Sequence, residues 1–415
     1  MRSGRDGDTG TAAGVGVRRE VTRPAATPPA TGATGATSPR LRLPRGDLGL
    51  WPIAVGLVLI WAIFQYENAS FLSPGNLTNL ILQIAATGTM AVGIFVVLLI
   101  GEIDLSVGVV SGLSGALLGI LAVNHGINGA VAVLVTLAAG LGIGLLHGFF
   151  VVRFRVPSFV VTLAGLIGWQ GLQLQLLGNG GSIIFPDSGI TRLTSTFLNP
   201  VPAVILGVAV CAVYGASLWR TRSRRQREGL PVISQRSALL RLLVLTVAVA
   251  GTVVVMERDR GLPVALLIFV GIVALVDLGV RHTHFGRYML AIGGNAEAGR
   301  RAGVPVDGVR IGVLAFCSMM AAAGGILSAS RLLSVSASSG AGDTLLNAIA
   351  AVVIGGTSLF GGRGTAYSAL LGILVIGSIS NGMDLLNLGS PVKFMITGVV
   401  LLIAVSLDAL SRARR

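Results

Sequence analysis

Two acidic residues lie two positions apart between long apolar runs. Glu102 and Asp104 are followed by the hydroxyl of Ser106 and then by Gly108. A charge near the centre of a bilayer costs at least about 2.5 kcal/mol, so acidic residues in this position require an explanation. Either they belong to a broken or re-entrant helix that lines a cavity, or they are solvated in a tight turn at the cytoplasmic surface. Residue types and spacing leave both interpretations open.

A second stretch, residues 355–365, contains five glycines and lies between two other apolar runs. Gly356 and Gly361 have the spacing of a phosphate-binding P-loop, but Gly362 and Arg363 stand where that motif requires Lys and then Ser or Thr. The chain is therefore not predicted to bind or hydrolyse ATP itself. The residues of this stretch that we associate with translocation, together with those around Glu102, are Thr357, Ser358, Gly361, Gly362 and Arg363.

A third stretch, residues 291–303, lies within the polar loop 281–310. Residues 297–302 can form a short helix, with Asn295 as its N-cap and Gly303 at its C-terminal end, where glycine is favoured. A short polar helix across the cytoplasmic face could transmit force from a soluble partner, and an ordinary basic loop is the alternative. The candidate coupling residues are Gly293, Gly294, Asn295, Glu297, Arg300, Arg301 and Gly303.

The composition predicts which elements must position these stretches. Hydrophobic residues make up 53% of the 415 residues and charged residues 12%, with a mean hydropathy of +0.83. A soluble domain could not hide so much apolar surface, and many runs approach the roughly 17–25 residues needed to cross a bilayer. We predict an all-α fold, a polytopic bundle of about twelve transmembrane helices and at least about ten. The spans are expected near residues 50–65, 80–100, 105–123, 130–150, 157–177, 200–219, 242–256, 263–280, 311–329, 344–360, 365–384 and 393–409.

The two ends of the chain differ from this transmembrane region. Residues 1–48 contain five prolines and no aromatic residue. Such a segment cannot bury enough apolar surface to offset the entropy of ordering it, so we expect a disordered basic tail. Residues 49–410 are the predicted transmembrane domain, and residues 411–415 form a short basic tail.

The basic residues orient the spans. A net charge of +14 could indicate nucleic-acid binding. If the N-terminus is cytoplasmic and each run crosses once, however, 26 of the 31 Lys and Arg residues lie on the cytoplasmic side. This is the positive-inside pattern of a plasma-membrane protein. It predicts that both termini are cytoplasmic, and it makes a nucleic-acid partner unexpected.

The remaining reactive side chains form no catalytic or metal-binding pattern. Cys211 and Cys317 each lie in an apolar run, so we expect buried packing and neither a disulfide nor a zinc site. His125, His147, His282 and His284 lack partners at metal-ligand spacing. No enzymatic activity and no metal site are expected.

Taken in their order along the chain, the three stretches resemble the permease family of bacterial ABC importers for ribose, xylose and related sugars. Residues 101–108 resemble the family's Gly-x-Ile-Asp-Leu-Ser-Val-Gly motif, with Glu102 at a position often occupied by glycine. Residues 291–303 resemble its Ala-Ile-Gly-Gly-Asn loop, and residues 355–365 its Gly-Gly-Thr-Ser-Leu-Phe-Gly-Gly-Arg-Gly-Thr motif. Residues 156–163 are similar to a fourth segment of the family.

The resemblance implies a permease subunit of the bacterial inner membrane that has no cofactor of its own. Its expected partners are a cytoplasmic sugar-type ATPase, which binds ATP and docks on loop 281–310, an extracytoplasmic sugar-binding protein, a second copy of the chain, and membrane lipid. The apolar hairpin near residues 200–260, with an Arg-rich inner loop, resembles the xylose-type layout more than the shorter ribose-type one. The solute implied is xylose or a related pentose.

Two alternatives stay open. The same architecture could carry a branched-chain amino acid, a nucleoside or a signalling furanone. An ion-coupled secondary transporter would instead use Glu102 and Asp104 to bind the coupling ion.

Overall fold

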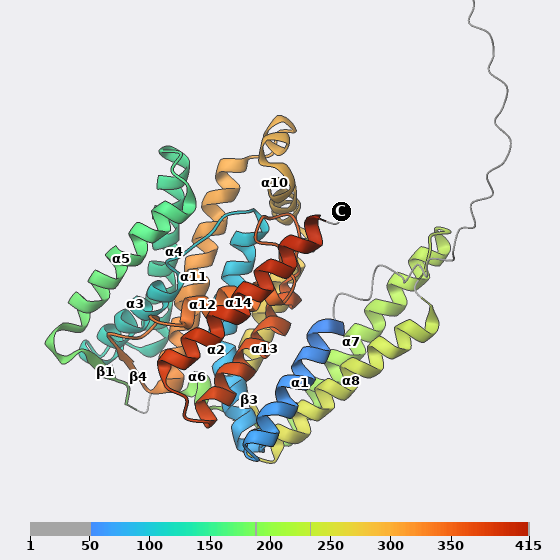
Figure 1. Cartoon of the computed structure of the whole chain (residues 1–415), viewed down its shortest axis with the longest axis horizontal. Helices are drawn as coiled ribbons and strands as arrows, with labels where there is room; N and C mark the ends of the chain where they lie inside the picture. Colours follow the sequence, from blue (N-terminus) through green and yellow to red (C-terminus); the bar gives the residue numbers. More distant parts are fainter. Residues whose placement is uncertain (1–50, 187–188, 233, 414–415) are drawn as a thin grey trace, which may run out of the picture. The chain divides into compact units, whose positions relative to one another are not determined.

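The computed structural model describes residues 51–186, 189–232 and 234–413, and this part of the chain is almost entirely helical (Figure 1). The predicted N-terminal tail, residues 1–48, lies outside the described residues, as do Arg414 and Arg415 of the predicted C-terminal tail. The helices and strands are, in chain order, α1 (Trp51–Glu67), α2 (Pro74–Leu99), α3 (Val107–Gly119), a π-helical turn (Ile120–Asn124), α4 (Gly129–Arg153), α5 (Ser158–Leu177), a 3-10 turn (Gly178–Gly180), β1 (Ser182–Ile184), α6 (Arg192–Ser195), β2 (Phe197–Leu198), α7 (Pro200–Arg227), α8 (Gln235–Glu257), β3 (Leu262–Pro263), α9 (Val264–His282), α10 (His284–Arg301), α11 (Val306–Leu332), β4 (Ser334–Ser336), α12 (Thr344–Ile354), α13 (Ala366–Leu385) and α14 (Ser390–Ala413).

The helices confirm an all-α polytopic membrane protein. Within the described residues, nine helices are long and apolar enough to cross a bilayer, and three shorter apolar helices accompany them. Each of the twelve predicted spans contains one of these helices. The strands are short and form two antiparallel pairs, β1 with β4 and β2 with β3, at connections between helices.

One predicted span differs from the structure. The run expected at residues 344–360 is only an 11-residue helix, α12. At 1.5 Å per residue it is about 17 Å long, roughly half of the 30 Å hydrocarbon core. The apolar run continued through Phe360, but the glycines from Gly355 onward leave the helix and form a loop. Hydrophobicity alone therefore overestimated this span.

Helix α2 forms the centre of the bundle (Figure 1). In its membrane-length window 83% of the residues are buried, because α9, α11, α12 and α13 all pack against it. Glycines on α2 allow the close approach. A Cβ added at Gly88 would lie 2.5 Å from the ring of Phe269, and one at Gly93 would lie 2.9 Å from the Cβ of Met320.

Helix α4 packs against α11 through a face of glycines. Gly140, Gly144 and Gly148 are buried there, in the four-residue spacing of a small-residue packing motif. A Cβ added at Gly148 would lie 2.7 Å from the Cα of Ile311, and one at Gly144 would overlap the carbonyl of Leu314. The opposite face of α4 is apolar and exposed, as expected for a surface that meets lipid.

Helices α7 and α8 form the hairpin expected from the extra apolar runs. Their buried residues are Ala203 on α7 and Val253 and Met256 on α8, all near the β2–β3 end. These residues contact the bundle through a small cluster that includes Leu262. Elsewhere the described apolar side chains of both helices are largely exposed, so this hairpin is attached to the bundle at one end.

We expect Gly144→Val to lower the thermal unfolding midpoint of the purified protein by about 5 °C or more, because the new side chain meets the backbone of α11 and the helices must separate. Gly142→Val is the matched control, since a Cβ at Gly142 meets nothing within 4 Å. Thermal unfolding in detergent measures both. Equal losses in the two variants would contradict the assigned packing face.

Candidate functional site

The three glycine-rich stretches singled out in the sequence meet at one end of the bundle. The amide of Gly362 donates a hydrogen bond of 2.9 Å to the carbonyl of Leu99, the last residue of α2. A Cβ added at Gly293 of α10 would overlap that same carbonyl and the amide of Gly362. We call Gly101, Gly293, Gly361 and Gly362 the glycine junction.

The glycine junction can form only because its members lack a side chain. Gly101, Gly361 and Gly362 have φ values of +78°, +88° and +75°, which residues with a Cβ rarely adopt. A Cβ at Gly361 would also lie 2.9 Å from both the amide nitrogen of Gly101 and the carbonyl oxygen of Gly293. Three backbone segments therefore lie in van der Waals contact, from α10, the end of α2 and the 355–365 loop.

An ion pair reinforces the glycine junction. Glu102 Oε1 lies 2.9 Å from Nε of Arg310, near the start of α11, and both side chains are mostly buried. Removing one partner of such a pair leaves a charge in a poorly solvated place. This pairing could not be predicted, because Arg310 was only one of several basic residues in the predicted loop 281–310. The pair ties the α2–α3 turn to α11.

The α2–α3 turn is partly exposed and partly buried. Gly101 and Ile103 are exposed, whereas Asp104 and Ser106 are buried. Asp104 Oδ1 accepts hydrogen bonds from the amide of Ser106 (2.8 Å) and from its hydroxyl (2.6 Å), which orders the start of α3. The turn thus lies at the end of the bundle with its polar side chains directed inward.

The first turn of α5 holds the same loop in place. Ser158 Oγ accepts a hydrogen bond from the amide of Ile103 (3.2 Å), and Thr162 Oγ1 accepts one from the amide of Leu105 (3.1 Å). Both hydroxyls belong to the segment 156–163 that resembled a family motif. The fourth motif therefore positions the first.

The 355–365 loop is ordered by its own hydroxyl groups. Thr357 and Ser358 are buried, and the amide of Ser358 donates to the carbonyl of Arg363 at 3.0 Å. Thr365 and Ser368 form a capping box that begins α13. Arg363 and Phe360 are exposed at the tip. These contacts assign Thr357 and Ser358 a structural role in the loop.

Helix α10 is divided by a kink at Asn295, which has non-helical φ and ψ of −163° and 103°. Asn295 Oδ1 accepts a hydrogen bond of 2.9 Å from the amide of Ala298, which confirms the predicted N-cap of a short second helix. Gly303 ends that helix with φ +83°, as predicted. The first half of α10 buries Met289 and Ile292 in the core.

The second half of α10 presents charged side chains outward. Arg301 pairs with Glu297 at 3.3 Å, and Arg300 pairs with Asp307 of α11 at 3.0 Å. The hydrogen bonds that the Arg300 guanidinium donates to the Asp307 carboxylate raise the pKa of Arg300 above its ordinary value. Exposed pairs of this kind add little stability. Their placement therefore suits contact with another molecule.

A polar segment between β4 and α12, residues 337–343, folds back into the bundle, and we call it the re-entrant segment. Its place in the site was not predicted from the sequence. Gln173 of α5 is buried, and its amide nitrogen donates to the carbonyls of Ser336 (3.1 Å) and Ser339 (3.0 Å). Gly340, with φ +76°, lies directly against the backbone of Gly108 and Gly112 in α3. Non-helical backbone at membrane depth is tolerated only where protein or a cavity satisfies it. The signal that could have revealed it is the serine- and glycine-rich run at residues 334–343.

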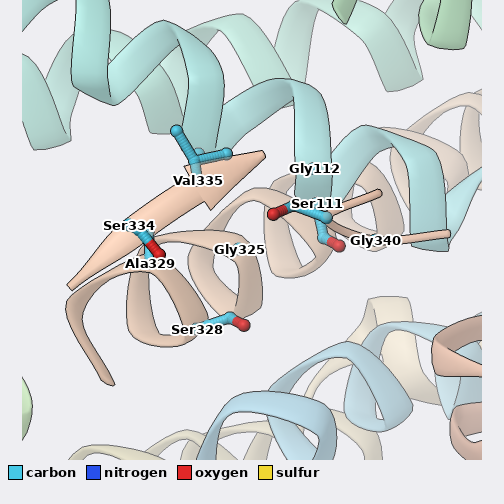
Figure 2. Close-up of a pocket in the computed structure, with 10 residues that line it drawn as sticks. Ser111, Gly112, Gly325, Ser328, Ala329, Ser334, Val335 and Gly340 are labelled. Carbon is cyan, nitrogen blue, oxygen red and sulfur yellow. The ribbon is translucent and has the colours of Figure 1, made fainter. Parts of the chain in front are cut away.

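A small cavity lies beside this segment. It has a volume of about 10 Å³, close to the space of one water molecule. Figure 2 shows Ser111 and Gly112 of α3, Ser328 of α11 and Ser334 of β4 around it. Four serines contribute hydroxyl groups to its lining, the other lining residues are small or apolar, and none is charged. Such a lining suits the hydroxyl groups of a neutral solute.

Comparison with known proteins assigns the family. Residues 76–405 match the model of the family described as branched-chain amino acid transport system / permease component. This chain belongs to that permease family. The xylose transport system permease protein of Haemophilus influenzae is 34% identical over 89% of this chain and 98% of its own length. The corresponding Escherichia coli protein is 32% identical over 89% of this chain and 93% of its own, and the E. coli ribose import permease protein is 31% identical over 85% and 92%. No solved structure matches this chain.

The family match covers every element of the site in this permease. It includes the α2–α3 turn, α10, the 355–365 loop and the re-entrant segment before α12. The glycine junction therefore brings together residues of all three motifs that carry the family resemblance. Several predicted residues lie outside the glycine junction. Asp104 and Ser106 are buried at the start of α3, Gly108 lies against Gly340, and Glu297, Arg300 and Arg301 are on the exposed half of α10.

We expect Gly293→Ala to lower the thermal stability of the permease by about 3 kcal/mol or more at the unfolding midpoint, since the methyl group overlaps two backbone groups that cannot both move away. Gly294→Ala is the control, because a Cβ at Gly294 meets nothing within 4 Å. Thermal unfolding and yield of folded protein measure the difference. If both alanines are tolerated equally, the three segments do not meet as described.

Gln173→Leu should destabilise the permease by about 1–3 kcal/mol, because the carbonyls of Ser336 and Ser339 would lose their donor. Gln175→Leu on the exposed side of α5 serves as the control and should have little effect. Protection of residues 334–343 from hydrogen exchange provides a local measurement. Unchanged protection in Gln173→Leu would show that Gln173 does not hold this segment.

Proposed function

We propose that this permease is the membrane-spanning subunit of an ATP-driven importer of a monosaccharide, with xylose or a related pentose as the favoured solute. The observation that carries the proposal is the meeting of α10 with the ends of α2 and the 355–365 loop at the glycine junction. The match over almost the full length of a xylose permease and the weaker match to a ribose permease support the sugar.

The proposed ATPase partner docks on the exposed second half of α10. Asn295, Glu297 and Arg301 line an open hollow there, and Arg300 is exposed on the same half of the helix. Arg363 is exposed at the tip of the 355–365 loop. ATP is bound by this partner and not by the permease, which uses no cofactor of its own. A solute-binding protein docks at the opposite end of the bundle, and two copies of the chain form the complete pore.

Force transfer follows from the backbone contacts. A partner that pulls α10 moves Gly293, and Gly293 lies against both the last carbonyl of α2 and the amide of Gly362. The Glu102–Arg310 pair carries the same movement to α11. The two nucleotide states of the ATPase must bind α10 differently for this contact to shift the permease between its two conformations.

The uncharged hydroxyl-lined cavity marks part of the solute path. The cavity lies beside the re-entrant segment, and one short helix, α12, connects that segment to the 355–365 loop of the glycine junction. A movement of the 355–365 loop therefore reaches the cavity through α12. Since the cavity holds only about one water molecule, the path is closed in this conformation.

The alternative of an ion-coupled transporter has less support. Glu102 is paired with Arg310, and Asp104 Oδ1 accepts two hydrogen bonds from Ser106. The buried Asp104 Oδ2 has no hydrogen-bond partner among the described residues, so Asp104 is the carboxylate that this alternative would use. Uptake that survives deletion of the ATPase but collapses with the ion gradient would reverse this conclusion. The permease family name leaves a branched-chain amino acid as the other solute class to be tested.

Arg300→Ala and Glu297→Ala should each reduce sugar uptake by about tenfold when the permease is reconstituted with its ATPase and binding protein, while ATP hydrolysis continues. The reason is that either change removes a charged contact proposed to carry force from the ATPase. Arg287→Ala, an exposed arginine in the first half of α10, is the control and should transport normally. Uptake at the wild-type rate in both test variants would refute the coupling assignment.

A further inference from the structure

The α7–α8 hairpin ends in a dense group of arginines that the transport mechanism does not use. Residues 220–241 contain seven arginines and only one acid, Glu228. Arg220, Arg224 and Arg227 recur at the spacing of one helix face. They are exposed together with Arg236, and no ion pair joins these four to an acid in the part of the chain that the structure describes.

The length of α7 places these arginines at the membrane surface. The apolar part of α7, residues 200–219, is about 30 Å long at 1.5 Å per residue, which matches the hydrocarbon core. Arg220 therefore lies where the hydrocarbon core ends. The preceding residue, Trp219, is 69% exposed, and an exposed tryptophan at this depth is typical of the membrane–water interface.

The apolar sides of the hairpin continue without a break into the arginine group. Val208 and Val213 on α7 and Leu243 and Val247 on α8 are all exposed. The hairpin is buried only near its other end, at Ala203, Val253 and Met256. Its apolar flanks and its arginines thus form one continuous surface along the bilayer.

We propose that the arginine tip of the α7–α8 hairpin is a binding site for the phosphate of anionic phospholipids, with the acyl chains lying along the exposed flanks of α7 and α8. Arginine forms paired hydrogen bonds with phosphate, and a polybasic cluster next to a transmembrane helix attracts anionic headgroups. A soluble acidic protein could neutralise the arginines but could not cover the apolar flanks below them. A lipid satisfies both parts of the surface, and this site does not depend on which solute is carried.

The tip lies at the same end of the permease as the glycine junction. The hairpin begins and ends beside the β2–β3 pair, α9 starts at that pair, and α9 then runs to α10. The bound lipids would therefore occupy the leaflet nearest the proposed ATPase dock. Because the hairpin is attached to the bundle at one end, lipids bound at the tip hold its free end in the membrane.

The test measures lipid binding to the purified full-length permease by native mass spectrometry, with phosphatidylglycerol and phosphatidylcholine as separate probes. We expect phosphatidylglycerol to bind about tenfold more tightly than phosphatidylcholine, and Arg224→Gln/Arg227→Gln to remove about that factor while leaving phosphatidylcholine binding unchanged. Arg224→Lys/Arg227→Lys, which keeps the charge, should retain most of the preference.

Arg153→Gln/Arg155→Gln is the matched control, since it removes the same charge from the exposed α4–α5 turn at the same end of the bundle. It should change phosphatidylglycerol affinity by less than about twofold. The proposal fails if the wild type shows no preference between the lipids, or if the test and control pairs lose affinity equally. It also fails if Arg224→Gln/Arg227→Gln leaves lipid binding intact and instead abolishes binding of the ATPase subunit.

Discussion

The permease depends on a backbone-to-backbone contact that admits no side chains. Gly101, Gly293, Gly361 and Gly362 bring three segments, remote in sequence, within van der Waals distance at one end of the bundle. Polar backbone is costly in an apolar environment unless it is paired, and the bond from the amide of Gly362 to the carbonyl of Leu99 pairs two such groups. The same closeness removes any flexible side chain that could absorb a movement of α10.

The other irregular segment obeys the same constraint at greater depth. The chain from β4 to α12 leaves helical geometry inside the bundle, so its carbonyls need donors from neighbouring helices. Gln173 supplies two of them, and the glycines of α3 give the segment room to approach.

The distribution of charge divides these tasks among different surfaces. Buried or half-buried charges at Glu102, Asp104 and Arg310 have polar partners that hold the junction. Exposed charges at the second half of α10 face outward, where a partner can contact them. The arginines of the α7–α8 tip are in neither of these positions. They stand at the end of a hairpin whose apolar side chains are largely exposed among the described residues. Arginine occurs in all three places, and its surroundings differ from one place to the next.

Hydrophobicity, local capping preferences and motif order were sufficient to predict a polytopic helical bundle, the N-cap at Asn295 and the permease family. These features are local or periodic, so a single chain records them directly. The pairing of Glu102 with Arg310, the meeting of the four junction glycines and the re-entrant segment held by Gln173 could not be predicted, because they join residues separated by tens to hundreds of positions. An apolar run likewise predicts that a segment is buried. It does not predict where α12 ends, because Gly355 lies against the backbone of Ser368, a contact that the run does not record. Tertiary structure alone brings such partners together, since no periodicity along the chain encodes a contact between distant segments.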